Sequence, residues 1–520
     1  MLTMSMKRTL LGFFVLFSSC LLAQDSQTAI FMDLSAQHTR LHVSSRPSTG
    51  YLGMPLLGNT RIEMGNSLVH PVQWLSQAPD ASEATLNLDA VRQSFSDRND
   101  LSMDLQWDWL NAGGFSANRR SFWSVAVSEH IQSCVELPED LMRLPFTGNA
   151  GASLMGTSLD FSALSLQFSH RREFSGTWQY EWNEKISSGL RLAYLQGLSY
   201  VGTRDNTTEW TINPDTYAWS VQGGLGVDVA GWPGEDSKEV NDYLNTKGNR
   251  GFSADVAIQF QPTDQWSGFV QVADLGRLNW NSDAQNWNIA DTTMVFSGLT
   301  INDLGSLDSW PSDSLENWLE STGNDWEAAF TADTSSSGFT QKGMPKLSIG
   351  LSWEAFRTQH QKGTLGAWMR SDGRGFMDWR LSYNHRLNDW LGLAMSWGGS
   401  QSRNSTLGLA LCMNAGPLAL FVATDHIGFS KWTRIAIEER RDGAIATVEE
   451  YVVPNQAHTM QLQAGLTWRF GWKKQSSKRQ MAVPPSNQNG YKGGSTRSPG
   501  KDHREHPGAV PCNAPGSWKD

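Results

Sequence analysis

Single charged residues interrupt several apolar, alternating segments of this sequence. Asp104 and Asp108 flank Leu105 and Trp107, and Asp255 lies between two apolar neighbours. A dry protein interior would penalise these charges, whereas a water-filled channel would accept them. We therefore expect six residues to line a lumen and set the selectivity of a pore: Asp104, Asp108, Asp255, Asp378, Arg380 and Arg469. Structural ion pairs across the lumen of a closed barrel are an equally good interpretation.

The other chemically reactive side chains form no recognisable catalytic or metal-binding pattern. The histidines considered are scattered along the chain: His170, His385, His426 and His458. The cysteines after the leader have no metal-ligand or redox spacing, and their odd number leaves at least one thiol over: Cys134, Cys412 and Cys512. No nucleophile elbow or phosphate-binding loop occurs. We expect no enzyme activity, no catalytic residue, no metal and no cofactor.

The candidate lumen residues lie in segments with two-residue alternation, which predicts β-strands. The clearest segment is 460–472, where Leu462, Leu466 and Trp468 share one face and Gln463 shares the other with Arg469. Such segments recur at lengths near the roughly 9–11 residues that cross a membrane as a tilted strand. The sequence therefore predicts an all-β fold, a transmembrane antiparallel up-and-down β-barrel of about 14 to 16 strands, closing at the last segment.

Composition favours this barrel over a soluble alternative. The chain has 24 Trp and 48 Gly, and many of the glycines fall inside apparent strands, where they weaken an ordinary core. Aromatic girdles at the membrane interfaces would use the tryptophans. A soluble antiparallel sandwich, or a Trp-rich carbohydrate-binding module, stays the alternative because its strands alternate too.

The N-terminus predicts export. Lys7 and Arg8 precede an apolar run at 10–17, and cleavage after Ala23 would complete a signal peptide of residues 1–23. Lipoprotein attachment at Cys20 is the alternative. No later stretch reaches the roughly 18 apolar residues of a spanning helix. We expect an exported outer-membrane protein of a Gram-negative bacterium.

Two segments of the mature chain stand out by charge. Residues 302–343, within the barrel region 24–472, are acidic and predict a loop or plug insertion with a short helix. Residues 473–520 carry nine Lys or Arg against three Asp or Glu and predict a disordered basic tail. Removing the tail and the basic leader residues from the formal charge of −10 leaves the body near −18.

Three shorter features are interpreted as turns. Arg171, Arg172 and Glu173 fall between two apparent strands and predict a solvated hairpin turn. Asp274 and Asp425 each follow an apolar segment, so we expect them to bond turn backbone.

A succession of short motifs resembles the uncharacterised outer-membrane barrel family called domain of unknown function 5723, of the porin-like class. The motifs run in order over about residues 45–472, and each is weak alone. Their key positions are Gly53, Pro55, Arg143, Asn149, Arg172, Glu173, Pro214, Asp215, Tyr217, Asp274 and Gly276. The resemblance implies an outer-membrane barrel and brings no substrate. This chain departs from simple barrels because a tail follows its last strand.

Two functions remain open at this stage. The first is porin-like or substrate-specific transport of a small or apolar solute. The second is a non-conducting structural or scaffold barrel for a secretion or surface-assembly system. The expected partners are outer-membrane lipid, the barrel-assembly machinery and a periplasmic or surface protein bound through the loops or tail, with no nucleic acid. A large polar lumen would favour transport, and a filled or plugged lumen would favour a scaffold.

Overall fold

The computed structural model describes residues 27–67, 75–77, 84–86, 88–95, 98–147, 156–231, 248–296, 320, 323–325, 328, 330–371, 377–400, 403–427, 432–441, 444–454 and 459–471. The chain divides into two units, Met1–Trp472 and Lys473–Asp520, and the description below concerns the first. The predicted signal peptide, the basic tail and Asn149 lie outside the described residues. So does most of the predicted helical insertion, of which Glu320, 323–325 and Ala328 are helical.

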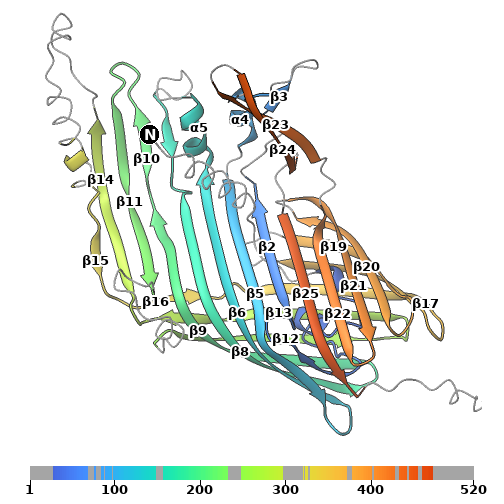
Figure 1. Cartoon of the computed structure of the whole chain (residues 1–520). Coiled ribbons are helices and arrows are strands. Elements are labelled where there is room, and N and C mark those ends of the chain that lie inside the picture. The colour runs from blue at the N-terminus through green and yellow to red at the C-terminus, as the bar shows by residue number, and fades with distance from the viewer. Residues whose placement is uncertain are drawn as a thin grey trace, which may run out of the picture. The chain divides into compact units, whose positions relative to one another are not determined.

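Fourteen antiparallel strands close into a barrel, which confirms the predicted fold (Figure 1). The first stave is formed by two short strands in line, β1 (Gly50–Gly53) and β2 (Thr60–Asn66). The others follow in chain order: β5 (Arg98–Phe115), β6 (Ser121–Pro138), β8 (Ser165–Asn183), β9 (Ile186–Asn206), β12 (Arg250–Phe260), β13 (Trp266–Trp280), β17 (Lys346–Arg357), β18 (Lys362–Ser371), β19 (Met377–Arg386), β20 (Leu391–Ser400), β21 (Arg403–Ala415), β22 (Leu418–Ile427) and β25 (Thr459–Phe470).

The last strand closes the barrel, as the sequence predicts. β25 pairs with β22 on one side and with β1 and β2 on the other. The register runs from Gly50 opposite Phe470 to Gly65 opposite Thr459. Every backbone group along this seam therefore has a neighbouring strand to bond, which membrane burial requires.

The two faces of the staves differ in polarity. Leu192, Ile258 and Leu462 point outward and are 57%, 55% and 51% exposed. Their strand neighbours point inward, and in β25 these include the buried Gln461 and Gln463. An apolar band that faces away from a polar interior is the surface that lipid tails cover in a membrane-spanning barrel.

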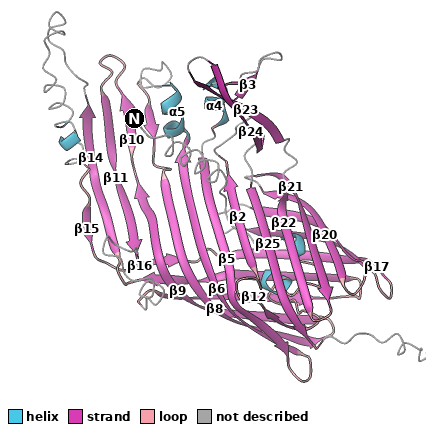
Figure 2. Ribbon diagram, viewed as in Figure 1, coloured by secondary structure: helices cyan, strands magenta, loops and turns pink. Residues whose placement is uncertain are grey.

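The two ends of the barrel differ in their connections (Figure 2). At one end, which we call the turn end, short turns join consecutive staves, such as 184–185 and 416–417. At the other, the loop end, most connections are long, such as 67–97 and 207–249, although β20 and β21 are joined by 401–402 alone. Both β1 and the end of β25 lie at the turn end, since Gly50 pairs with Phe470.

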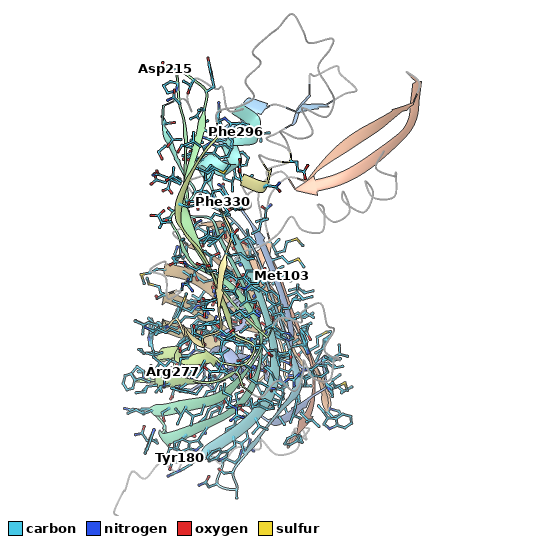
Figure 3. The ribbon with its side chains drawn as sticks, turned by 90° about the vertical axis from the view of Figure 1, so that its left-hand side faces the viewer. Met103, Tyr180, Asp215, Arg277, Phe296 and Phe330 are labelled. Atoms are coloured by element: carbon cyan, nitrogen blue, oxygen red, sulfur yellow. The ribbon has the colours of Figure 1, made fainter. Side chains whose placement is uncertain are left out.

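One side of the barrel continues beyond the common height of the staves. β9 pairs with β12 through Gln196 and then, from Tyr200 onward, with β11 (Trp219–Ala230). Figure 3 shows Asp215, before β11, and Tyr180, in β8, at opposite ends of this side. The extension adds these strands: β7 (Ser158–Asp160), β10 (Glu209–Ile212), β14 (Gln285–Phe296), β15 (Asp333–Ser335) and β16 (Phe339–Lys342).

Further short elements belong to the long connections at the loop end. They are β3 (Leu75–Gln77), β4 (Ala84–Leu86), α4 (Leu88–Ser94), α5 (Glu139–Thr147), β23 (Trp432–Arg441) and β24 (Ala444–Pro454). β3 pairs only with β4, and β23 only with β24, so neither pair is a stave. Among the described residues, no helix is both long and apolar enough to cross a membrane.

Three turn predictions are wrong. Arg171, Arg172 and Glu173 lie in the middle of the 19-residue strand β8. Asp274 lies within β13 and Asp425 within β22. In each case partners from elsewhere in the chain, on neighbouring strands or, for Asp425, in residues 27–28, bond the charged side chain within a strand, and the local sequence does not reveal those partners.

Candidate functional site

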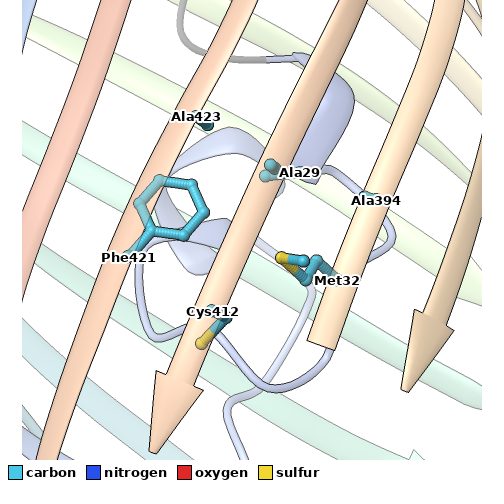
Figure 4. Packing of buried hydrophobic residues seen from close by; sticks show 7 residues of the cluster. Ala29, Met32, Ala394, Cys412, Phe421 and Ala423 are labelled. Atoms are coloured by element: carbon cyan, nitrogen blue, oxygen red, sulfur yellow. The ribbon is translucent and has the colours of Figure 1, made fainter. Parts of the chain in front are cut away.

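An N-terminal segment fills much of the lumen. Residues 27–49, which we call the plug, contain the short helices η1 (Gln27–Ala29) and α2 (His38–Leu41). Ala29 and Met32 pack on Cys412 and Phe421 of the inner wall (Figure 4). The wall is built from small inward-facing residues there, such as Ala394, so the plug fits closely. The lumen is thus closed by a segment of the chain itself.

The start of the plug is bonded to two buried charged residues of the wall, Asp425 and Arg380. The Asp425 carboxylate accepts hydrogen bonds from the Gln27 and Thr28 backbone N–H groups and from the Thr28 hydroxyl. Arg380 donates to the Gln27 side-chain oxygen at 3.2 Å and to the Asp425 carbonyl oxygen at 3.2 Å. Since charge-assisted bonds are the strong ones, this cluster anchors the first residues of the plug.

The middle of the plug is held by a second ion pair. Arg40 in α2 pairs with Asp108 of β5, whose side chain is 1% exposed. The Asp108 carboxylate also accepts from Ser128 at 2.8 Å and from Asn111 at 2.9 Å. At the turn end, Asp33 pairs with Lys362 at 3.1 Å.

One wall glutamine bonds the plug backbone in both directions. The Gln271 side-chain oxygen accepts from the Val43 N–H at 3.0 Å, and its nitrogen donates to the Leu41 carbonyl at 3.3 Å. Between them, the His42 ring lies 3.8 Å from the ring centre of Phe269. We call this contact between Gln271 and residues 41–43 the latch.

Inward-facing glycines make room for the plug. A methyl group added at Gly189 would lie 1.8 Å from the Val43 carbonyl oxygen, so the plug could not keep its position. The other wall glycines whose added methyl group would meet a plug residue are Gly366, Gly392, Gly408 and Gly465. Part of the glycine content inside strands is therefore explained by the plug.

Both plug histidines are buried and uncharged. Burial lowers the pKa of His42 to about 3, and burial also lowers the pKa of His38 although Ser35 and Asp33 oppose the shift. Burial raises the pKa of Asp33, but Lys362 and Arg386 outweigh this effect and the pKa is lowered. The docked plug thus has a carboxylate at its turn-end ion pair and neutral imidazoles.

A pocket of about 420 Å³, which we call the upper pocket, lies toward the loop end. Its inner lining includes Asp104 from β5, Arg171 and Glu173 from β8, and Leu195 and Tyr200 from β9. The other lining residues are Ser102, Met103, Gln132, Ser133, Cys134, Gln167, Ser169, Phe252, Ser253, Asp274, Gly276, Arg277, Leu278, Gln341, Lys342, Gly343, Met344, Lys346 and Arg370. Met103 and Arg277 are labelled in Figure 3.

The upper pocket reaches both faces of the wall where one strand ladder is interrupted. β13 pairs with β17 up to Ala273 and with β16 only from Arg277, so the ladder is absent between them. Asp274 occupies this gap with a φ of 60°. The pocket is lined there both by side chains on the outer face of the wall, such as Phe252, and by side chains on the inner face, such as Leu278.

A second hollow, the lower cavity, has a volume of about 160 Å³ and lies toward the turn end. Its lining includes Gln259, Phe269, Ser352 and Thr364 from the same four staves that line the upper pocket, β12, β13, β17 and β18. Plug residues such as His42 complete it. Gln271 lies on β13 between the parts of that strand that line the two hollows, so the latch separates them.

The six predicted lumen residues lie on the inner wall but do not form one site. Asp104 pairs with Arg61 at 2.8 Å, and Asp255 pairs with Arg191 at 3.1 Å. Asp108 and Arg380 contact the plug, as described above. Asp378 is buried on β19, and Arg469 donates to the Thr49 hydroxyl at 3.3 Å. Their role in selecting a solute stays a prediction.

The family-motif positions serve mainly to shape the wall. Gly53 and Pro55 lie at the break between β1 and β2, and Arg143 pairs with Glu139 within α5 at 2.6 Å. Pro214, Asp215 and Tyr217 form the turn before β11, with Tyr217 at a φ of 57°. Asp274 pairs with Lys346 at 2.7 Å, and an added methyl group at Gly276 would lie 2.0 Å from the Phe252 carbonyl oxygen.

Arg172 and Glu173 face opposite sides of β8. Glu173 points inward and pairs with Arg191. Arg172 is on the outward face and donates to Glu129 at 2.8 Å. Glu129 also accepts from His170 at 2.9 Å and from Trp109 at 2.9 Å, so this outward carboxylate is enclosed by donors. Such enclosure reduces the cost of a charge on the lipid face.

Sequence reasoning missed the plug, the latch residue Gln271 and the cations of the upper pocket. The plug has no strand alternation, and its partners are spread over distant strands. The available signal for the plug was the set of inward-facing glycines on staves that are far apart in the sequence. These glycines can be recognised as inward-facing only when the strand register is known. Among the described residues, no group of three or more His, Cys, Asp or Glu could hold a metal ion. No disulfide joins Cys134 and Cys412.

Comparisons with known proteins identify a family. The model of the family of unknown function DUF5723 matches residues 45–425. A comparison with curated proteins finds no match. Among solved structures, the chain is similar to a Pseudomonas aeruginosa FadL homologue with 8% identity, coverage of 87% of this chain and 100% of that chain, and a TM-score of 0.38. The chain is also similar to the Pseudomonas putida toluene transporter TodX, with 7% identity, coverage of 88% of this chain and 96% of that chain, and a TM-score of 0.37.

Proposed function

We propose that this chain, which belongs to the DUF5723 family, is a plugged transport barrel of the outer membrane that binds a small amphipathic solute in its upper pocket. In outer-membrane barrels the short turns face the periplasm and the long loops face outward. We therefore place the upper pocket toward the cell exterior and the lower cavity toward the periplasm. A solute would pass from one to the other when the plug moves.

The observation that carries this proposal is the arrangement of the two hollows. Both are lined by β12, β13, β17 and β18, and the latch lies between them. A route along these staves needs only the release of two hydrogen bonds and the movement of residues 41–43. The lining of the upper pocket combines apolar and charged residues, which suits a solute that has both kinds of surface.

An open porin is a poorer explanation because the plug is buried against the wall and held by ion pairs at Asp33 and Arg40. The non-conducting scaffold is the second candidate. The firm docking of the plug favours it, since a lumen that never opens would need the same contacts. The two candidates differ in whether breaking the latch opens a passage.

The test is conductance of the purified full-length protein in planar bilayers. We expect the wild-type protein to be closed with brief openings, and Gln271→Leu to open more often. Gln179→Leu is the matched control, because Gln179 is a buried inner-wall glutamine whose side chain bonds no other described residue. If Gln271→Leu and the wild-type protein are equally closed at all voltages, the scaffold candidate replaces the transport proposal.

A further inference from the structure

Each carboxylate of the upper pocket lies in an ion pair with a cation of the wall. Asp104 pairs with Arg61 at 2.8 Å, and Asp274 pairs with Lys346 at 2.7 Å. Glu173 pairs with Arg191, which also pairs with Asp255 at 3.1 Å. The residues that line the pocket include five Lys or Arg against three Asp or Glu, so the lining is positive overall.

Two inner arginines of the same pocket have no carboxylate partner among the described residues. Arg171 donates to the neutral side-chain oxygen of Gln132 at 2.6 Å. The guanidinium of Arg370 lies 5.6 Å from the ring centre of Trp368, and its Nε is buried and bonds no described group. An arginine keeps its charge at all accessible pH values, so both remain positive, and Arg171 interacts with Glu173 and Asp274 only through longer-range electrostatics.

Two further cations lie at the outer side of the pocket. Arg277 and Lys342 are directly opposite each other in the pairing of β13 with β16. Arg277 lies 5.9 Å from the ring centre of Phe252, and no described carboxylate is within ion-pair distance of either cation. The formal charge of the whole chain is −10, so this collection of unbalanced cations is local to the pocket.

The uncharged lining of the pocket combines polar side chains, mostly serine and glutamine, with an apolar part. Met103, Leu195, Leu278 and Met344 contribute hydrocarbon surface, and Tyr200 contributes an aromatic ring. A volume of about 420 Å³ is within the range of small-molecule sites. A guanidinium binds carboxylate, phosphate and sulfate groups through charge-assisted hydrogen bonds.

We propose that the upper pocket selects an anionic amphiphile, a solute that carries a carboxylate, phosphate or sulfate group on a short apolar portion. Arg171 and Arg370 bind the anionic group, and the apolar lining receives the rest. Arg277 and Lys342 attract the anion to the outer mouth. This inference rests on the proposed function because it uses the same upper pocket as the binding site. Binding to this pocket can be measured whether or not the protein transports the solute.

The experiment is a binding titration of the full-length protein in a neutral detergent. Decanoate, decyl phosphate and decyl sulfate are compared with decanol and decyltrimethylammonium, and inorganic phosphate tests the head group alone. We expect the anionic probes to bind at least about tenfold more tightly than decanol, and the cation not to bind. The three anions together show whether the site distinguishes carboxylate from phosphate or sulfate.

Variants then assign the effect to the two arginines. Arg171→Gln and Arg370→Gln should each weaken anion binding about tenfold and leave decanol binding unchanged. Arg171→Lys should retain part of the preference. Arg204→Gln, which removes an arginine paired with Asp228 outside the pocket, is the matched control. Heat-dependent gel migration confirms that each variant is folded.

The outcomes separate the two proposals. If decanol binds as tightly as decanoate, or if neither glutamine variant changes the anion preference, the anionic-ligand inference is overturned whatever the conductance shows. If the anions bind selectively but Gln271→Leu never opens, the inference stands and the transport proposal fails.

Discussion

At the scale of single residues, the inner wall is stabilised by charges whose partners come from distant parts of the chain. Asp108 is the clearest example, since Arg40 reaches it from the plug across 68 positions of sequence. An isolated carboxylate in this position would be costly, because burial removes its water. The ion pair therefore couples docking of the plug to the wall charge.

This coupling predicts the effect of removing one partner. Arg40→Met should weaken docking of the plug by about 3–5 kcal/mol, because Asp108 is left without its cation. The double variant Arg40→Met/Asp108→Leu should recover most of the loss, since no buried charge remains. Hydrogen exchange of residues 27–49 measures docking. Equal protection in the single variant and the wild-type protein would show that the pair contributes nothing to it.

The residues that sequence reasoning misjudged are explained at this scale. The run Arg171 to Glu173 predicts a turn because three charges in succession break the alternation. In the barrel, Arg172 faces Glu129 outside, and Arg171 and Glu173 face Gln132 and Arg191 inside. The strand continues because each charge has a partner. Those partners are known only once the strand register is known.

At the scale of elements, the fit between plug and wall depends on small residues. Gly189→Ala should displace Val43, because an added methyl group would lie 1.8 Å from its carbonyl oxygen. We expect faster limited proteolysis within the plug. Gly176→Ala is the control on the neighbouring strand β8, where an added methyl group meets nothing within 4 Å. Unchanged cleavage of Gly189→Ala would mean that the plug adjusts without loosening.

The plug should also respond to acid. His38 and His42 have lowered pKa values while docked, and a released plug would restore them to about 6.5. Docking is therefore most stable above about pH 6.5. It loses about 1.4 kcal/mol per pH unit through His42 as the pH falls toward 3, and His38 adds a loss in the same direction. The carboxylate of Asp33 has a lowered pKa and would respond only at the acid end of this range.

Hydrogen exchange of the plug between pH 7 and pH 4.5, corrected for the intrinsic rate, measures this response. His42→Phe should reduce the pH dependence, since the histidine with the strongly lowered pKa is removed and the ring contact with Phe269 is kept. A plug whose corrected protection is the same at both pH values would contradict the prediction.

At the scale of the whole molecule, the barrel was predictable and its contents were not. Alternation in segments such as 460–472 follows from the period of a strand with one lipid face and one lumen face. This alternation was enough to predict the barrel fold, the strand that closes it and the inward orientation of the six charged residues. The sequence also predicts strands near 215–229 and 291–300. These correspond to β11 and β14, which belong to the extension, because alternation does not show which strands pair. The prediction that the acidic insertion 302–343 forms a loop or plug stays a prediction. The described part of this insertion adds β15 and β16 to the wall.

The outward apolar band makes a depth-dependent prediction. Leu192→Arg places a charge in the middle of the outer face of β9 and should destabilise the barrel in bilayers by about 2–4 kcal/mol. Trp182→Arg, equally exposed at 57% but next to the turn at 184–185, should cost about 0–1 kcal/mol. Urea unfolding from lipid vesicles gives both values. Equal costs at the two positions would place the membrane elsewhere on the barrel.

Transport depends on movement of the plug, either as one body or only at residues 41–43, and a reversible crosslink distinguishes the two. The hydroxyl oxygens of Thr28 and Ser396 are 2.6 Å apart, so a Thr28→Cys/Ser396→Cys pair is placed to form a disulfide between plug and wall. We build it into the Gln271→Leu protein, whose latch is already broken. If the whole plug must leave its anchor at Asp425, oxidation should abolish the openings and a reductant should restore them, while Ser396→Cys alone should have no effect. If the oxidised protein still opens, only residues 41–43 move, and the route between the two hollows forms while the start of the plug stays in place.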